Sequence, residues 1–361
     1  MPSADLANVW RLFGTARAPA IAISLSVALA SLLILVTGKN PLEAAEAVWT
    51  GAFGSPNALA GTMALATPLI FTALAFAVPF RGSMFNAGAE GQLLIGAFCA
   101  AYVGFAVQLP GPLHAVAMVM AGAAGGAVWA FLPALWRVTL GANEIVTTLM
   151  MNFIAVFLTD YLVIHAFRAP GQSGSAIKTE PIAASAELAK LWPPFNVTIA
   201  LPLAILLAVI VWYLFRRTVF GYEIRMVGSA PGFAAAAGIR PGMRMMAVMV
   251  IGGALAGLGG AAQVGGVFHA FVSPFGTGLG FNGVLVALLV ANVFPAIPFA
   301  AVFIGALQAG AIGIELTTPV SRWIVAAMTA TIILFVAARR VGWSDLRFRS
   351  ATPRSVDGGV E

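Results

Sequence analysis

Long apolar blocks fill most of the chain, and short polar stretches separate them. Blocks of about 18 or more apolar residues predict transmembrane helices, because about 20 helical residues cross the hydrocarbon core of a bilayer. The blocks predict ten spans, at residues 20–36, 59–80, 86–107, 112–132, 143–165, 198–215, 245–267, 280–294, 297–315 and 321–338. The chain is therefore predicted to be an all-α polytopic membrane protein. The short alternating segments of a transmembrane β-barrel are not present in the sequence.

The first apolar block, "AIAISLSVALASLLILV", ends at Val36. It is longer than the apolar core of about 7 to 15 residues in a cleaved signal peptide, so we interpret it as an uncleaved first span. The preceding residues carry Arg11 and Arg17, which favours a cytoplasmic N-terminus.

Composition and charge agree with a membrane protein. Hydrophobic residues make up 60% of the 361 and charged residues only 9%, whereas soluble domains are about one quarter charged. The net charge of +6 would indicate a nucleic-acid partner only if it formed one basic face, so we expect none. With ten spans, five of the 19 basic residues lie outside, namely Lys39, Arg168, Lys178, Lys190 and Arg322. The other fourteen lie inside, which predicts that both termini are cytoplasmic.

Three connecting segments and a tail complete a single transmembrane domain over residues 1–361. Residues 38–57 place Glu43, Glu46 and Trp49 at helical spacing and predict a short interfacial helix. Residues 166–197 form the largest extracytoplasmic loop, either a docking surface or a passive connector.

The largest cytoplasmic segment is residues 216–244. It contains a short Ala-rich helix at 233–237 between Gly and Pro breaks. It is either an amphipathic loop or a segment that fits a groove on another protein. Residues 341–361 are predicted to be a cytoplasmic tail.

An internal similarity links the third and eighth predicted spans. "MFNAGAEGQLLIGA" opens the third and "GFNGVLVALLVA" opens the eighth, so that Asn282 corresponds to Asn86. These two spans run in opposite directions under the ten-span model. An inverted-topology repeat would produce this pattern, and so would chance in a chain this rich in Gly and Ala.

Polar groups within the spans need a physical reason. A charged carboxylate at the bilayer centre costs roughly 2.5 to 3.5 kcal/mol on insertion scales. If Asn86 caps the third span and Asn143 the fifth, Glu90 and Glu144 lie in first turns, where the helix dipole favours negative charge. The alternative is that these groups line a polar pathway, where nearby aromatic rings would suit a solute with hydroxyls and a flat ring. The pathway candidates are Phe85, Asn86, Glu90, Asn143, Glu144, Asn152, Phe281 and Asn282.

The sequence offers no catalytic or metal-binding pattern. No G-x-x-x-x-G-K-[ST] phosphate loop occurs, and His114, His165 and His269 share no ligand spacing. Two G-x-x-x-G pairs, Gly122 with Gly126 and Gly253 with Gly257, predict close helix crossings. We therefore expect no cofactor, no metal and no enzymatic activity in this chain.

Three motifs together resemble one known family. "FNAGAEGQLLIGA" resembles the signature of permease subunits of bacterial ABC importers in the branched-chain amino acid and simple sugar permease superfamily. "GANEIVTTLMMNFIA", at 141–155, is similar to a second signature, that of the nucleoside-type branch. "GYEIRMVGSAPGFAAAAGI" looks like the family's ATPase-coupling segment, whose pattern falls on Gly221, Arg225, Gly228, Pro231, Ala235, Gly238 and Ile239. The segment departs from the family at Ala230, Gly232 and Ala237.

The resemblance covers roughly residues 59–340, and it implies a function. Such permeases work in pairs, often as heterodimers, in the bacterial cytoplasmic (inner) membrane. Two cytoplasmic ATPase subunits bind ATP and Mg, and an extracytoplasmic binding protein delivers the solute. The resemblance implies import of a nucleoside or a related ribosyl or sugar compound by alternating access.

Two other classes of transporter stay open from the residues alone. In an ion-coupled secondary transporter, the intramembrane carboxylates Glu90, Glu144 or Asp160 would carry a proton or bind sodium. A passive channel would need no partner. The coupling-type segment at 216–244 argues against both.

Overall fold

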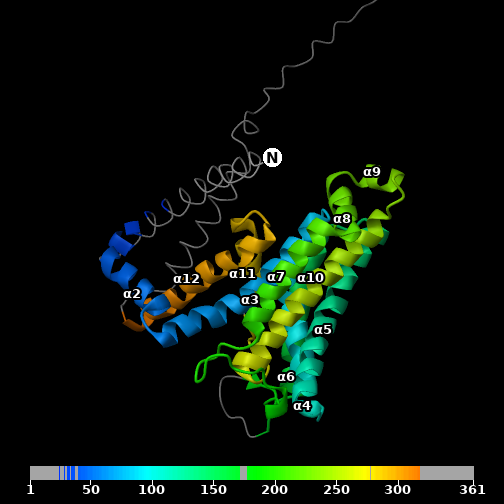
Figure 1. Cartoon of the computed structure of the whole chain (residues 1–361). Coiled ribbons are helices and arrows are strands. Elements are labelled where there is room, and N and C mark those ends of the chain that lie inside the picture. The colour runs from blue at the N-terminus through cyan, green and yellow to red at the C-terminus, as the bar shows by residue number, and fades with distance from the viewer. Residues whose placement is uncertain are drawn as a thin grey trace, which may run out of the picture.

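The computed structural model describes residues 40–170, 177–276 and 278–317, together with scattered positions between 24 and 36. The α-helices in these residues are α2 (Pro41–Phe53), α3 (Pro56–Arg81), α4 (Ala89–Ala106), α5 (Gly111–Leu140), α6 (Glu144–His165), α7 (Ala200–Arg217), α8 (Val219–Ser229), α9 (Pro231–Ala236), α10 (Pro241–Gln263), α11 (Leu279–Leu289) and α12 (Ile297–Thr317). The shorter elements are β1 (Ile177–Lys178), η1 (Ala184–Ala186), the π-helical turn η2 (Val264–Phe268), β2 (Val272–Ser273) and η3 (Phe294–Ala296). Figure 1 shows the resulting helical bundle.

Seven helices of the described residues are long and apolar enough to cross a membrane. They correspond to the second to seventh and the ninth predicted spans, so the prediction of an all-α polytopic membrane protein is confirmed. The tenth predicted span, most of the first, and the tail at 341–361 lie outside the described residues.

The eighth predicted span, 280–294, is wrong as a continuous helix. Its helix, α11, has 11 residues and is therefore about 16 Å long, roughly half the thickness of the hydrocarbon core. Gly278 precedes it with a φ of 89°, and Ala291 and Asn292 follow it in the left-handed region. These breaks limit the helix to one part of the crossing.

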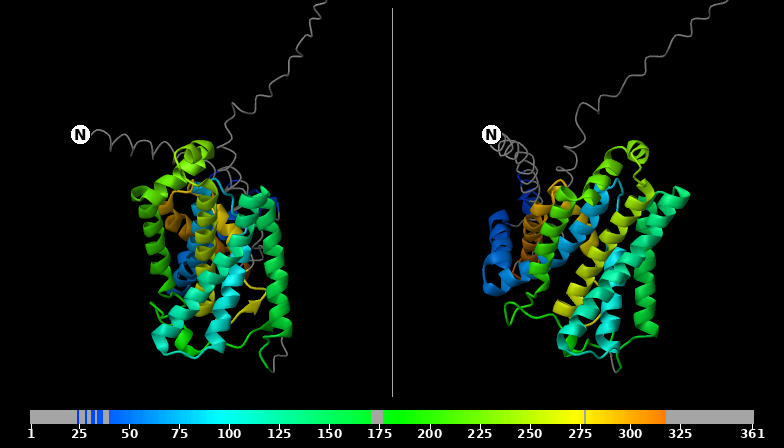
Figure 2. Two further views of the ribbon diagram at one scale, coloured as in Figure 1. Left: turned by 90° about the vertical axis from the view of Figure 1, so that its right-hand side faces the viewer. Right: turned by 45° about the vertical axis from the view of Figure 1, so that its right-hand side comes forward.

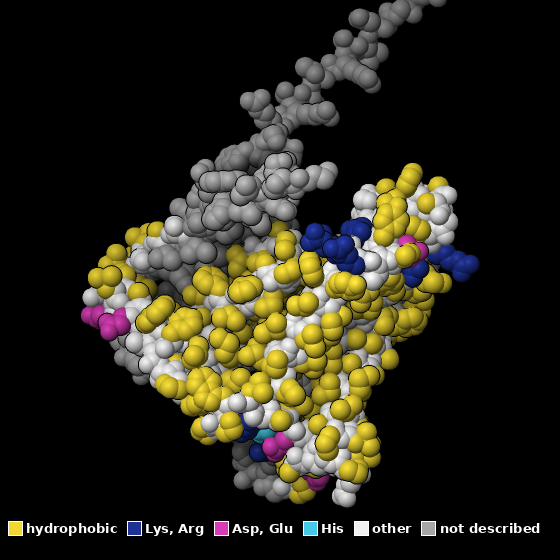
Figure 3. All heavy atoms as spheres, viewed as in Figure 1, with side chains coloured by type: hydrophobic (Ala, Val, Ile, Leu, Met, Phe, Trp, Pro, Cys, Tyr) yellow, Lys and Arg dark blue, Asp and Glu magenta, His cyan; other side chains and the backbone are white. Residues whose placement is uncertain are grey.

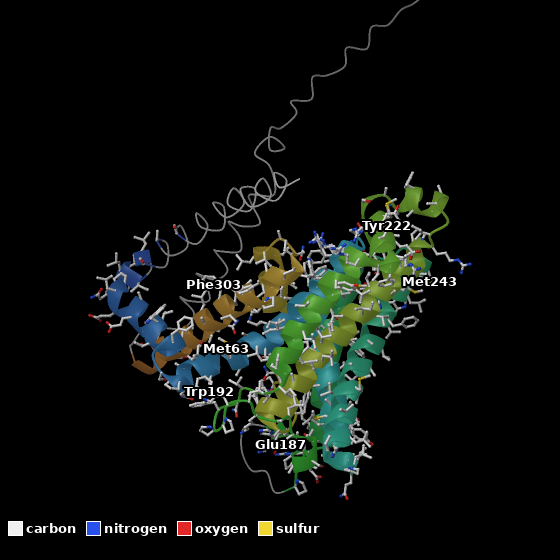
Figure 4. All side chains as sticks on the ribbon, viewed as in Figure 1. Met63, Glu187, Trp192, Tyr222, Met243 and Phe303 are labelled. Atoms are coloured by element: carbon white, nitrogen blue, oxygen red, sulfur yellow. The ribbon has the colours of Figure 1, made fainter. Side chains whose placement is uncertain are left out.

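The two ends of the bundle have different architectures. Figure 4 shows Tyr222 of α8 and Met243 of α10 at one end, and Glu187 and Trp192 at the other. We refer to the first as the inner end, since it carries the predicted cytoplasmic segment, and to the second as the outer end. Figure 2 shows that α8 and α9 project from the inner end in both views.

Helix α10 packs against α3, α4 and α5. A Cβ on Gly257 would lie 2.1 Å from the Gly122 carbonyl oxygen, and a Cβ on Gly126 would lie 2.2 Å from the Gly253 carbonyl oxygen. Only glycine permits this approach of two backbones, so the close crossing predicted from the G-x-x-x-G pairs is confirmed.

The described part of the outer loop is fixed to the bundle. Strand β1 pairs antiparallel with β2, with Ile177 opposite Ser273. The Leu188 amide donates to the Gly265 carbonyl at 2.9 Å, and the buried His114 ring contacts the Ser185 hydroxyl at 2.8 Å. The loop is therefore a structured cap over the outer ends of α4, α5 and α10.

Two short helices test the predictions for the connecting segments. The predicted helix in 38–57 is confirmed as α2, whose N-cap Asn40 accepts from the Leu42 amide. The predicted helix at 233–237 corresponds to α9. Helix α8, immediately before it, was not predicted, because its polar and apolar residues were interpreted as a loop.

Candidate functional site

The chain re-enters the bundle after α3. The Asn86 Nδ2 donates to the Ala75 carbonyl oxygen at 3.0 Å. Ala75 lies six residues before Arg81, the last residue of α3, so Asn86 sits about 9 Å deeper than the inner end of that helix. Ser83, with a φ of 60°, turns the chain inward. Helix α4 consequently begins inside the bundle.

A pair of side-chain amides holds this re-entrant segment, residues 82–88. Asn86 Nδ2 donates to Gln92 Oε1 at 2.9 Å, and Gln92 Nε2 donates back to Asn86 Oδ1 at 2.9 Å. Asn86 Oδ1 also accepts from the Gly88 amide at 3.1 Å. The predicted cap is wrong here: the N-cap of α4 is Gly88, and it makes no side-chain capping bond.

Asn152 of α6 holds the same segment from the other side. Its Oδ1 accepts from the Gly91 amide and its Nδ2 donates to the Ala87 carbonyl, both at 2.9 Å. Asn86, Gln92 and Asn152 are each 5% exposed or less. Their bonds to the protein itself indicate a structural role, since buried amides with satisfied donors and acceptors specify one packing.

Glu90 joins the start of α4 to the start of α11. Its Oε1 accepts from the Gly278 amide at 2.6 Å and its Oε2 from the Gly280 amide at 2.5 Å. The residue is 6% exposed. The carboxylate therefore lies at two helix N-termini, and both partial positive charges offset the cost of burying it. We call this contact the Glu90 junction.

The backbones of the two helices also meet at the Glu90 junction. A Cβ on Gly280 would lie 2.3 Å from the Glu90 nitrogen. The Thr72 hydroxyl of α3 donates to the Leu279 carbonyl at 3.1 Å. The first turn of α11 is thus held by α3 and α4 in the interior of the bundle.

Two candidate residues of α11 face away from this contact. Gly280 and Gly283 pack on α4 and α3, so Phe281 and Asn282 project from the opposite side of the helix. Phe281 is 44% exposed and Asn282 is half-buried. In the described part of the chain, no side-chain hydrogen bond involves Asn282. Phe85, by contrast, packs edge-on against Phe76, with centroids 4.9 Å apart.

Asn143 and Glu144 lie elsewhere. Asn143 caps α6, as predicted, and accepts from the Ile145 and Val146 amides. Glu144 forms an ion pair with Arg137 of α5 at 3.3 Å. Since Asn143 lies nine residues before Asn152 on α6, it is about 13 Å nearer the inner end. The structure does not bring these two residues to the Glu90 junction.

The predicted coupling segment forms two helices, α8 and α9, and α8 contacts the inner end of α3. A Cβ on Gly228 of α8 would lie 2.2 Å from the Arg81 carbonyl oxygen. Ile224 packs near Gly82, the first residue after α3. Arg81 Nη2 in turn donates to the Asn292 carbonyl at 2.9 Å. This path runs from α8 through Arg81 to the turn after α11. It was not predicted, because in the sequence Arg81 served only as one of the basic residues counted to assign the topology.

The remaining coupling residues shape the segment itself. Gly221 allows α8 to turn tightly away from α7, since a Cβ there would lie 2.4 Å from the Leu214 carbonyl oxygen. Pro231 opens α9, and Gly238 follows it with a φ of 81°. Ala235 is exposed, Ile239 is half-buried, and only Ala234 of α9 is fully buried. The projecting α9 is thus free of the bundle on most of its surface.

The three carboxylates of the ion-coupled alternative all have partners. Glu90 accepts two backbone amides, Glu144 pairs with Arg137, and Asp160 accepts from the Ser273 hydroxyl at 2.5 Å. Each therefore has a structural role in the bundle.

Comparison with known proteins identifies the family. Residues 58–290 match the family described as branched-chain amino acid transport system / permease component. The chain belongs to this family. The permease is thus the membrane subunit of an ABC importer rather than an enzyme. The resemblance found in the three sequence motifs is confirmed.

Three relatives are similar over nearly their whole length. Guanosine ABC transporter permease protein NupP of Bacillus subtilis (strain 168) is 34% identical over 89% of the permease and 92% of NupP. Nucleoside ABC transporter permease protein NupB of Lactococcus lactis subsp. cremoris (strain MG1363) is 33% identical over 89% and 90%. Glucose ABC transporter permease protein TsgB13 of Haloferax volcanii is 30% identical over 97% and 95%. No solved structure matches at a comparable level.

Proposed function

We propose that the permease imports a nucleoside, or a related ribosyl or sugar compound, across the inner membrane of a bacterium. It works with a second, related permease, two cytoplasmic ATPase subunits that bind ATP and Mg, and an extracytoplasmic binding protein. The names of NupP and NupB support a nucleoside, and the name of TsgB13 keeps a sugar within the proposal.

The observation that carries the mechanism is the continuous contact from α8 to the Glu90 junction. Gly228 touches the end of α3, Arg81 holds the turn after α11, and Glu90 holds the start of α11. A force on α8 and α9 from closing ATPases would reach both ends of α11. Helix α11 is then the element that moves between the inward-open and outward-open states.

The solute pathway follows the free side of α11. Phe281 and Asn282 project from that side, while the amides of Asn86 and Asn152 are occupied by the fold. An aromatic ring beside a free amide suits a solute with a flat ring and hydroxyl groups. In the assembled transporter this side of α11 would face the second permease, and it would form one half of the pathway.

The proposal includes ten spans, two cytoplasmic termini and an inverted repeat. Helix α4 runs from the Glu90 junction toward the outer end, and α11 runs from it toward the inner end. Opposite directions from one shared point support the repeat suggested by Asn86 and Asn282.

The test begins with the cognate binding protein. A thermal-shift panel of guanosine, uridine, ribose, glucose and riboflavin identifies the solute, and uptake of that solute is then measured in vesicles holding the complete transporter. We expect a nucleoside to stabilise the binding protein and its uptake to require ATP and the permease. Uptake that persists without ATPase subunits and collapses with an uncoupler would instead establish ion coupling.

Asn282→Ala tests the pathway. Loss of one solute hydrogen bond should reduce uptake about tenfold, with assembly of the transporter unchanged. Asn57→Ala is the matched control, because Asn57 is exposed in the first turn of α3 and far from α11 in sequence. Equal uptake by the two variants would remove Asn282 from the pathway.

A further inference from the structure

Two adjoining hollows open at the inner end of the permease. The larger, of about 280 Å³, lies between α3, α7, α8 and η3, and its lining is Arg81, Trp212, Phe215, Arg216, Arg225 and Phe294. The smaller, of about 250 Å³, shares Arg81 and Arg225 with it and reaches Ala291 and Asn292. We call the two together the Arg81 cleft. Figure 3 shows basic side chains gathered at this end, beside the projecting α8–α9 segment.

The charge of the Arg81 cleft is uncompensated in the described part of the chain. Three guanidinium groups face it, from Arg81, Arg216 and Arg225, and none of the described residues that line the two hollows is a carboxylate. The Nε of Arg81 is buried and has no hydrogen-bond partner there. Like charges around one cleft repel one another, so an anion between them would be stabilised.

A buried amide independently indicates a ligand. Asn292 is 2% exposed, and neither its Nδ2 nor its Oδ1 has a partner within the described residues. Buried polar side chains are nearly always hydrogen-bonded, so an exception requires an explanation. Ala291 and Asn292 both have left-handed backbone conformations, with φ of 59° and 57°. This turn after α11 brings Asn292 to the smaller hollow. Asn292 lines the smaller hollow beside Arg81.

The walls of the Arg81 cleft select the kind of anion. Arginine binds phosphoryl oxygens through several donors at once. Beside the arginines stand Trp212, Phe215 and Phe294, with the Arg216 guanidinium 5.5 Å from the Trp212 ring centre. Free phosphate has no apolar part that could pack against these aromatic rings. A phospholipid has an acyl chain that could.

The position in the bundle agrees with a lipid. Arg216 belongs to the last turn of α7, and the same helix exposes Val209, Ile210 and Tyr213 along its outward side. An acyl chain could follow this apolar surface while its headgroup enters the cleft. Basic pockets at the cytoplasmic ends of transmembrane helices are typical sites for anionic headgroups.

We propose that the Arg81 cleft binds the phosphoryl headgroup of an anionic phospholipid, with Arg81, Arg216, Arg225 and the Asn292 amide as ligands. Arg225 is on α8, and Asn292 follows α11. The headgroup therefore bridges the coupling segment and the turn after α11, so that binding strengthens the contact between them.

Lipid binding to the purified full-length permease tests this site without any transport assay, so its failure is distinguishable from failure of the proposed function. Phosphatidylglycerol, phosphatidylcholine or inorganic phosphate is added to the permease in neutral detergent. Thermal unfolding and native mass spectrometry then report binding. Saturating phosphatidylglycerol should raise the unfolding temperature by about 4 °C or more. The other two additives should have little effect.

Charge variants identify the residues. Arg216→Gln and Arg225→Gln should each weaken phosphatidylglycerol binding about tenfold, because each removes a charge-assisted contact. Arg217→Gln is the matched control, since Arg217 is exposed like its neighbour Arg216 but does not line the cleft. It should bind as the unaltered chain does.

Four results would overturn the proposal. Equal weakening by Arg217→Gln would show general surface attraction, and an equal shift from inorganic phosphate would show a free-phosphate site. No shift with phosphatidylglycerol in a folded sample would show that no lipid site exists. If Arg216→Gln and Arg225→Gln weaken ATPase binding and leave lipid binding intact, the arginines belong to a protein interface.

Discussion

The Glu90 junction and the Arg81 cleft lie at opposite ends of α11, and both bring polar groups into an apolar protein. At the junction, Glu90 accepts two amides, and the neighbouring amides of Asn86 and Asn152 are bonded to the chain. In the cleft, the side-chain amide of Asn292 has no partner in the described residues. Polarity alone therefore does not identify a ligand site in a membrane protein; unsatisfied polarity does.

The largest effect is expected at the junction. Glu90→Gln replaces one acceptor oxygen with an amide that would face a backbone N–H of α11. Losing charge-assisted bonds to a buried group should lower the free energy of unfolding by about 3 kcal/mol and reduce uptake at least tenfold. Thermal unfolding in detergent and ATP-driven uptake check this.

Glu144→Gln is the matched control, because Glu144 is half-buried and makes one ion pair near the inner end. Such a pair contributes less than about 1 kcal/mol. If the two variants behave alike, Glu90 does not hold α11.

The next effect is expected at Asn152. Asn152→Ala leaves the Gly91 amide and the Ala87 carbonyl without their partner. We expect a loss of about 1 to 2 kcal/mol, above the average of about 0.6 kcal/mol for an interhelical hydrogen bond in a membrane protein. Thermal unfolding measures it, with Asn57→Ala as the control. An unchanged unfolding temperature would mean that the re-entrant segment does not depend on α6.

Gly228→Ala tests the contact that links α8 to α3. The added Cβ would meet the Arg81 carbonyl at 2.2 Å, so the helices must separate, at a cost of about 1 kcal/mol or more. ATP hydrolysis should continue while uptake falls severalfold. Gly232→Ala, in α9, meets nothing within 4 Å and should leave both rates unchanged. Tight coupling in both variants would remove α8 from the mechanism.

The smallest effect on stability is expected in the Arg81 cleft, where it would set the cleft apart most clearly from the Glu90 junction. Asn292→Gly removes a buried side-chain amide that has no partner among the described residues, at a left-handed position that glycine readily adopts. In lipid-free detergent, the free energy of unfolding should change by less than about 0.5 kcal/mol. A loss as large as that of Asn152→Ala would show that the Asn292 side chain is bonded in the permease alone.

Much of the fold could be predicted from residue patterns because they act locally. The length of the apolar blocks predicted the seven spans that the structure describes. The spacing of the glycines predicted the close crossing of α5 and α10. Asn143 as a helix cap is likewise a local property, since an Asn before a helical block bonds the next two or three amides.

The same local reasoning gave the wrong cap for α4. Asn86 has the composition of a cap, but its amide is bonded to Ala75 and Gln92 instead. The length of α11 was also missed, because hydropathy does not detect the left-handed residues at 291 and 292. Composition cannot reveal which distant backbone a side chain will meet.

The amino-acid sequence by itself determined the class of protein, the helices that bury apolar surface, and the three motifs of a permease. These follow from hydrophobicity and spacing within single segments. Tertiary structure alone decided that Glu90 bonds residues 188 and 190 positions later and that Arg81 links α8 to the turn after α11. It also left the Asn292 side chain without a partner among the described residues. Whether a buried polar group is satisfied depends on the backbone that folding brings within about 3 Å of it.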